Sequence, residues 1–128
     1  MADPTHEDAQ LVVVVQLAQL GTQMVHPQAR GWIWSDDFTS DSQEFWEKHP
    51  PGTVGFDYVS GVATWYETVG TLWKHNLLEE TLLFDWLYVT GMWERLKPIL
   101  LEMRKSTPQL WENFEALAEA QSAALAGA

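Results

Sequence analysis

The strongest constraint on the fold is a seven-residue repeat of apolar side chains in the second half of the chain. The repeat advances by alternating steps of four and three residues, and its members are Leu82, Trp86, Val89, Trp93, Leu96, Leu100 and Met103. Side chains at this spacing share one side of an α-helix, whereas a strand would alternate every second residue. The repeat predicts a helix over residues 80–105, kinked at Pro98, because proline removes a backbone hydrogen bond.

Residues 54–75 show a second helical stripe. Its apolar members are again three and four residues apart, at Val59, Val62, Tyr66, Val69 and Trp73. Another face of the same segment is mostly small and includes Gly70, so a second backbone could approach closely there. Asn76 follows the stripe, and asparagine tolerates the left-handed conformation that ends many helices. We therefore expect a helix over residues 54–75 that ends at Asn76.

Three weaker patterns complete the set of helices. Residues 7–24 carry a broad apolar stripe with Thr5 as candidate N-cap, and the helical spacing outweighs the strand preference of the valine run. Residues 41–49 form a short helix that follows a candidate N-cap at Ser40. A last helix over residues 107–124 starts behind Ser106 and Thr107, with Pro108 at or near its first position.

These elements predict an all-α protein. Residues 31–39 are interpreted as a loop, and no strand is expected anywhere. Short links between the last three helices imply antiparallel neighbours. We therefore expect an antiparallel helical bundle of four main helices plus one short helix. The length of 128 residues suits a single domain over residues 1–128.

Charge and composition exclude several classes of function. The chain has 7 Lys and Arg against 18 Asp and Glu, a net charge of −11, so nucleic-acid binding is not expected. It has no Cys, and its 4 His form no ligand pair at metal-site spacing, so we expect neither a metal nor a cofactor. The longest apolar block is interrupted by glutamines and is too short to span a bilayer. The expected location is the cytoplasm.

Four segments in the second half of the chain follow recognisable helix-packing motifs. They are residues 62–72 (VATWYETVGTL), 74–80 (KHNLLEE), 92–98 (MWERLKP) and 111–118 (WENFEALA). These motifs resemble those of a bacterial family, the domain of unknown function 4760 family. The resemblance implies a helical fold and covers roughly the last half of the chain. That family has no agreed activity, so the resemblance implies no chemistry.

The chain departs from the family pattern at three places. Asn76 stands where the family turn usually has Gly, and Glu79 stands where it usually has Asp. Asparagine also tolerates the left-handed conformation, whereas glutamate is a weaker N-cap than aspartate. Many members carry an N-terminal membrane helix, and no span of that kind occurs here, so membrane anchoring is not carried over.

Glu67 is the carboxylate most suggestive of chemistry, because it lies among small residues on an apolar helix where burial could raise its pKa. A pocket that it shares with Tyr66 and Arg95 would make the chain a small-molecule-binding protein or minor enzyme. A structural role is the competing interpretation, in which Glu67 caps a helix or pairs with Lys74 or Arg95. We assign no catalytic residue on this pattern.

The 8 tryptophans are the most unusual part of the composition. Aromatic side chains at helical spacing usually form core, but this number exceeds what a small core needs. Trp32, Trp34, Trp86 and Trp93 are the candidate interface anchors, because tryptophan is enriched at binding hot spots. The sequence therefore favours a non-enzymatic interaction module that binds a protein partner or forms a homodimer.

Overall fold

The computed structural model describes residues 6–127 and contains seven α-helices and no strand within that range. Four helices are long: α1 (His6–Met24), α4 (Val54–Lys74), α6 (Val89–Met103) and α7 (Glu112–Ala126). Three are short: α2 (Ala29–Ile33), α3 (Ser42–Lys48) and α5 (Glu80–Trp86). The predicted all-α class is confirmed. The predicted count of four main helices and one short helix is wrong, because two further short helices are present.

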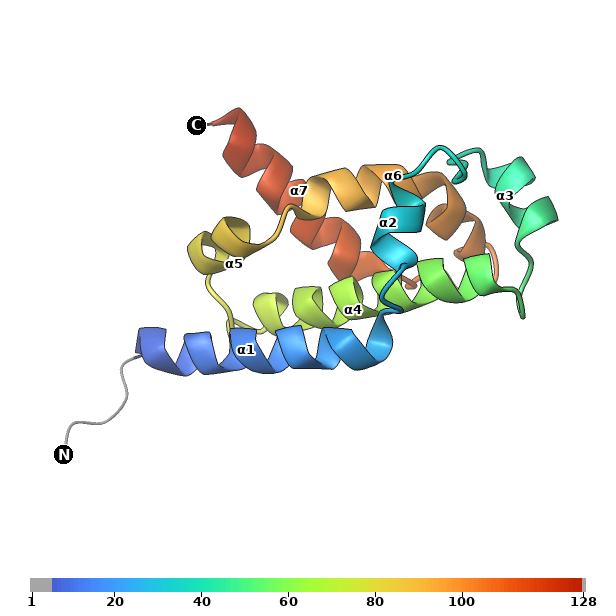
Figure 1. The fold of residues 1–128 in the computed structure, drawn as a ribbon. Helices are drawn as coiled ribbons and strands as arrows, with labels where there is room; N and C mark the ends of the chain where they lie inside the picture. Colours follow the sequence, from blue (N-terminus) through green and yellow to red (C-terminus); the bar gives the residue numbers. More distant parts are fainter. Residues whose placement is uncertain (1–5, 128) are drawn as a thin grey trace.

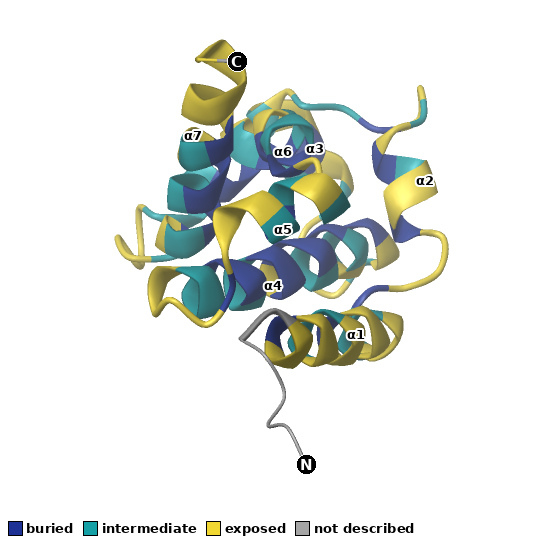
Figure 2. Ribbon diagram, turned by 90° about the vertical axis from the view of Figure 1, so that its left-hand side faces the viewer, coloured by how far each residue is buried: buried dark blue, intermediate teal, exposed yellow. Residues whose placement is uncertain are grey.

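Helix α4 lies at the centre of the arrangement. It packs against α1 on one side and against α7 on another, while α7 also packs against α6 (Figure 1). The helices α2 and α3 close one end through contacts with α4 and α6, respectively. Fully buried side chains fill the space between α4, α6 and α7: Val62, Val69, Leu96, Leu100, Phe114 and Leu117. Figure 2 shows α4 largely buried and α1, at the edge, largely exposed.

Glycines on two faces of α4 let two other backbones approach, and the approach at Gly70 is the one that the sequence predicted. A Cβ atom added at Gly70 would lie 2.5 Å from the carbonyl oxygen of Asn113, at the start of α7. A Cβ at Gly61 would collide with the carbonyl oxygen of Met24, at the end of α1. Close backbone approach at these two glycines sets how α1 and α7 pack on α4.

The helices α3 and α4 begin at caps supplied by their own sequence. The Asp41 side chain accepts a hydrogen bond from the Glu44 amide, and the Thr53 hydroxyl accepts one from the Phe56 amide. The predicted cap at Ser40 is therefore wrong by one residue, because the Ser40 hydroxyl donates instead to the carbonyl of Arg95. The cap predicted at Thr5 lies outside the described residues.

Helix α4 ends as its sequence predicts. Asn76 adopts a left-handed φ of 62° just after the helix. Its amide donates to the carbonyl of Trp73, and the Leu77 amide donates to the carbonyl of Leu72. This pair of bonds is a Schellman motif, which satisfies carbonyls that the helix end leaves without partners.

The single helix predicted over residues 80–105 is wrong. The helix breaks at Leu87, whose backbone is extended, and Pro98 lies inside α6. The cause is Gln121 of α7, which is buried at the break. Its side-chain oxygen accepts from the Val89 and Thr90 amides, at 2.7 and 2.9 Å, and its amide donates to the Leu87 carbonyl. These bonds replace the ladder of a continuous helix.

The start predicted for the last helix is also wrong. Helix α7 begins at Glu112 rather than near residue 107, and its N-cap, Trp111, has a left-handed φ of 65°. Neither Ser106 nor Thr107 caps it. The Glu67 carboxylate of α4 accepts hydrogen bonds from the amides of Asn113 and Phe114, at 3.0 and 2.9 Å. The start of α7 is therefore fixed by a side chain from another helix.

The segment predicted as a loop over residues 31–39 begins inside a helix. Residues Ala29–Ile33 form α2, with Ala29 and Ile33 fully buried against the core. Arg95 of α6 donates to the carbonyls of Ile33 and Ser35, at 2.9 and 3.1 Å. Burial and these bonds hold a helix that is too short to be stable on local propensity alone.

Three helices therefore begin at hydrogen-bond acceptors that other helices supply, which we call cross-helix caps. Besides Gln121 for α6 and Glu67 for α7, Gln10 of α1 accepts from the amide of Glu79, the N-cap residue of α5, at 2.8 Å. None of the three helices carries a capping bond from its own N-cap side chain. Helix starts expose amides that need acceptors, so these caps join α1, α4 and α7 to the helices that they start.

Candidate functional site

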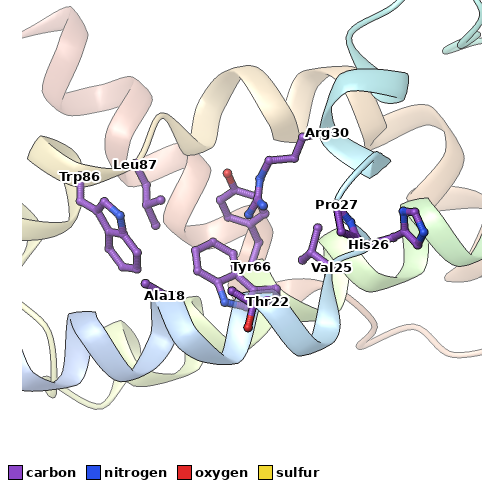
Figure 3. Close-up of a pocket in the computed structure, with 11 residues that line it drawn as sticks. Ala18, Thr22, Val25, His26, Pro27, Arg30, Tyr66, Trp86 and Leu87 are labelled. Atoms are coloured by element: carbon purple, nitrogen blue, oxygen red, sulfur yellow. The ribbon is translucent and has the colours of Figure 1, made fainter.

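A pocket lined by aromatic rings opens between α1, α2, α4 and α5, and we call it the aromatic pocket. Its volume is about 440 Å³, within the range of small-molecule sites. Trp65 and Tyr66 of α4 and Trp86 of α5 contribute the rings. Figure 3 shows Arg30 of α2 beside Tyr66. The remaining lining residues are Ala18, Gly21, Thr22, Val25, His26, Pro27 and Leu87. Among the residues that the structure describes, no Asp or Glu lines the pocket.

The rings of the aromatic pocket have fixed relative orientations. The rings of Trp65 and Trp86 meet edge to face, with centroids 5.7 Å apart and an interplanar angle of 84°. The Trp65 indole N–H donates to the carbonyl of Leu17 at 2.9 Å, which holds that ring in place. The Tyr66 ring stacks on Phe114 of α7 at 4.9 Å. These contacts give the pocket preformed apolar surfaces set at right angles to each other.

The polar groups of the pocket are Arg30 and the Tyr66 hydroxyl. The Arg30 guanidinium lies 5.2 Å from the centroid of the Trp65 ring, within cation–π range, and it is close enough to the Tyr66 hydroxyl to affect its pKa. Burial raises the pKa of the Tyr66 hydroxyl above its usual range, and the nearby Arg30 charge opposes part of that rise. Tyr66 is therefore a neutral hydroxyl at neutral pH and can donate a hydrogen bond.

The structure does not bring Tyr66, Glu67 and Arg95 together in one pocket. Tyr66 lines the aromatic pocket, but neither Glu67 nor Arg95 does. The Glu67 carboxylate caps α7, and the Arg95 guanidinium binds backbone carbonyls at the end of α2. Both charged groups therefore have structural partners in the fold.

The four candidate interface tryptophans lie in four different environments. Trp93 is 2% exposed and packs edge to face with Phe114 in the core. Trp32 packs among Phe38, His49 and Tyr58. Trp86 is half-buried in the wall of the aromatic pocket. Trp34 is 53% exposed and lies beneath the Arg95 guanidinium.

A second exposed apolar surface lies on α1, on the side that does not pack on α4. Leu11, Val12 and Val15 are 46%, 57% and 57% exposed and occupy adjacent turns of one helix face. We call these three residues the α1 outer patch. Leu17, which is buried on the same helix, accepts a hydrogen bond from Trp65 of α4 through its backbone carbonyl. Large exposed aliphatic side chains grouped in this way are typical of binding surfaces.

Comparison with protein families identifies the family of the chain. The family model described as domain of unknown function, DUF4760, matches residues 9–121. The chain belongs to this family. The match extends over α1 to α6 and most of α7, so the DUF4760 likeness reaches well beyond the second half of the chain. Searches of the curated proteins and of the solved structures found no match.

Neither a membrane-spanning helix nor a metal-binding cluster is found in the described part of this DUF4760 chain. Within residues 6–127, no helix combines the length and apolar character needed to cross a membrane. The same residues contain no group of three or more His, Cys, Asp or Glu side chains placed to hold a metal ion.

Sequence reasoning missed the role of Arg30 and the α1 outer patch, although each has a signal in the sequence. Arg30 is the only basic residue among the first 47 residues of a strongly acidic chain. The valine run over residues 12–15 places apolar side chains around the whole helix, and a helix packed on one neighbour must leave some of them exposed. Trp65 is missed as a pocket residue because its spacing also suits core.

Proposed function

We propose that this DUF4760 chain is a non-enzymatic self-association module. The observation that carries the proposal is the α1 outer patch, formed by Leu11, Val12 and Val15. A second copy would cover this patch with the same patch of its own α1. We place the contact on α1 rather than on the predicted tryptophans, because Trp32 and Trp93 pack inside the chain itself.

The chemistry of α1 suits a two-fold contact. A two-fold interface joins the same surface on both copies, so the surface must be compatible with itself. The helix carries no Lys or Arg, and its acidic residues are confined to its first turn. An antiparallel pair of α1 helices would keep these acidic ends apart and would align the helix dipoles favourably. Apolar side chains would then meet apolar side chains.

The exposed areas predict a weak dimer. Full burial of a Val or Leu side chain is worth about 1.5–3 kcal/mol, so covering the exposed half of these three contributes about 2–5 kcal/mol per copy. Two copies gain about 5–10 kcal/mol, and association itself costs about 4–15 kcal/mol. At the lowest cost the net gain is about 6 kcal/mol, so the patch alone supports a dissociation constant no tighter than about tens of micromolar. The net charge of −11 opposes association at low salt.

Sedimentation equilibrium over a wide range of protein concentration, up to about millimolar, tests the proposal. We expect a monomer–dimer equilibrium that strengthens as sodium chloride is raised, because salt screens the repulsion between acidic copies. A chain that stays monomeric over the whole range would refute self-association.

A matched pair of variants tests the position of the contact. Val15→Glu introduces a charge into the α1 outer patch and should abolish the dimer. Val54→Glu introduces the same charge at a valine of similar exposure, 64%, at the start of α4. It should leave the dimer unchanged. Equal weakening by both variants would mean that net charge, and not the α1 outer patch, governs association.

A further inference from the structure

The aromatic pocket has a chemical character that self-association does not use. We propose that it binds a small aromatic carboxylate, with the carboxylate on Arg30 and the ring against Trp86. The proposal rests on the charge of the pocket, on the fixed geometry of its rings and on its size. It is independent of the α1 outer patch, because Leu11, Val12 and Val15 do not line the pocket.

The Arg30 guanidinium has no carboxylate partner among the described residues. Four of the chain's cations pair with carboxylates: Lys48, Lys74, Arg104 and Lys105. Arg95 instead donates to two backbone carbonyls. No carboxylate among the described residues forms an ion pair with Arg30. Arg95 and Lys97 also lack a carboxylate partner among the described residues, but of these three cations only Arg30 lines the aromatic pocket.

Arg30 is also held in position to bind an anion. The Trp65 ring lies against the guanidinium, and the Arg30 charge is close enough to the Tyr66 hydroxyl to affect its pKa. A guanidinium has five N–H donors in a flat fork, so a carboxylate can bind it in a bidentate manner. Figure 3 shows the Arg30 side chain extending from α2 toward Tyr66. The Tyr66 O–H can donate to the same carboxylate.

The pocket walls specify the rest of the ligand. Trp65 and Trp86 meet at a right angle, and the wall beside them is aliphatic, from Ala18, Val25 and Leu87. Flat aromatic molecules gain from edge-to-face and offset-stacked contacts with such rings. A volume of about 440 Å³ suits one or two fused rings. A cationic ligand would be repelled by Arg30, and a neutral one would leave that charge unpaired.

Calorimetric titration with 2-naphthoate tests the proposal, with 2-naphthamide as its neutral counterpart. We expect the carboxylate to bind about tenfold or more tightly than the amide, because it adds a charge-assisted bidentate contact. Heteronuclear NMR should show shifts of the indole N–H signals of Trp65 and Trp86. Equal affinity for the two compounds, or shifts confined to other tryptophans, would refute the site.

Variants matched for charge separate Arg30 from the overall field of the protein. Arg30→Gln should weaken 2-naphthoate binding by about tenfold or more and leave 2-naphthamide unchanged. Lys97→Gln removes the same charge from α6, where Lys97 has no carboxylate partner, and should change neither affinity. Arg30→Lys should retain part of the binding. Equal effects of Arg30→Gln and Lys97→Gln would overturn the proposal.

Discussion

Replacing Glu67 tests whether this carboxylate acts as a cross-helix cap or as a chemical group. Its oxygen accepts from the amides of Asn113 and Phe114, and it is half-buried where α7 meets α4. Hydrogen bonds to charged groups contribute about 1.5–3 kcal/mol each. Glu67→Ala leaves two amides at the start of α7 without an acceptor, so we expect a loss of about 2–5 kcal/mol in unfolding free energy.

The amide variant gives a graded result. Glu67→Gln keeps an acceptor oxygen in place but removes the negative charge that favours a helix N-terminus. We expect it to lose about 1–2 kcal/mol, roughly half of the alanine effect. For a chain of this size, a loss of 1 kcal/mol lowers the melting temperature by about 3–6 °C.

Urea unfolding followed by tryptophan fluorescence measures these losses, and the m-value should stay constant. Glu112→Gln is the matched control, because Glu112 is exposed and lies 3.9 Å from Lys74. It should change stability by less than about 0.5 kcal/mol. If Glu67→Gln costs no more than Glu112→Gln, the capping argument fails.

Three further substitutions test other parts of the fold. Gly70→Ala should lower the free energy of unfolding by about 1–3 kcal/mol, because its Cβ would press on the backbone of Asn113. The control is Gly31→Ala, whose added Cβ has no atom within 4 Å, and it should not destabilise the protein in the same urea experiment. Asn76→Ala should lower the free energy of unfolding by about 1 kcal/mol, because it forces alanine into the left-handed conformation. Asn76→Gly should leave the free energy of unfolding unchanged. The melting temperatures of the two variants measure these effects. Burial raises the pKa of Tyr66, so as pH rises the unfolded chain loses the Tyr66 proton before the folded chain does. The free energy of unfolding therefore falls as pH rises above 10.0. Tyr66→Phe should reduce this fall in urea titrations between about pH 9 and 11.

Two of the helices predicted accurately from the sequence, α3 and α4, carry their own caps. The prediction of residues 41–49 agrees with α3 to one residue at each end, and that of 54–75 agrees with α4 at its start and to one residue at its end. Asp41 and Thr53 cap these helices locally, and Asn76 ends α4 locally. A signal within four residues of a helix end can be found without knowing the fold.

The boundaries that were missed are those set by distant residues. Gln121 breaks the segment over 80–105 from more than thirty positions away, and Glu67 starts α7 across 46 positions. The apolar repeat continues through the break at Leu87, so periodicity alone predicts one helix there. No local pattern in a sequence marks such a boundary, because its cause exists only after the helices have packed.

The candidate site was predictable only in its residue types. Sequence reasoning anticipated aromatic residues around Tyr66 but chose Glu67 and Arg95 as polar partners. Both side chains are used by helix ends. Arg30 lies 36 positions before Tyr66 and reaches the pocket only because the links on either side of α2 turn it back over α4. Its contribution depends on tertiary structure.

The positions of the cross-helix caps also bear on how far the domain can be shortened. The outermost of them are Gln10 and Gln121, which start α5 and α6 in the interior of the chain. A fragment that lacks either residue would lose the cap of a helix that lies far from the truncated end in the sequence. Truncation at a terminus would therefore destabilise helices in the interior of the chain. The shortest segment that retains all three caps is residues 10–121, and the family match covers residues 9–121. The extent of the family match thus coincides, to one residue, with the shortest segment that retains all three cross-helix caps.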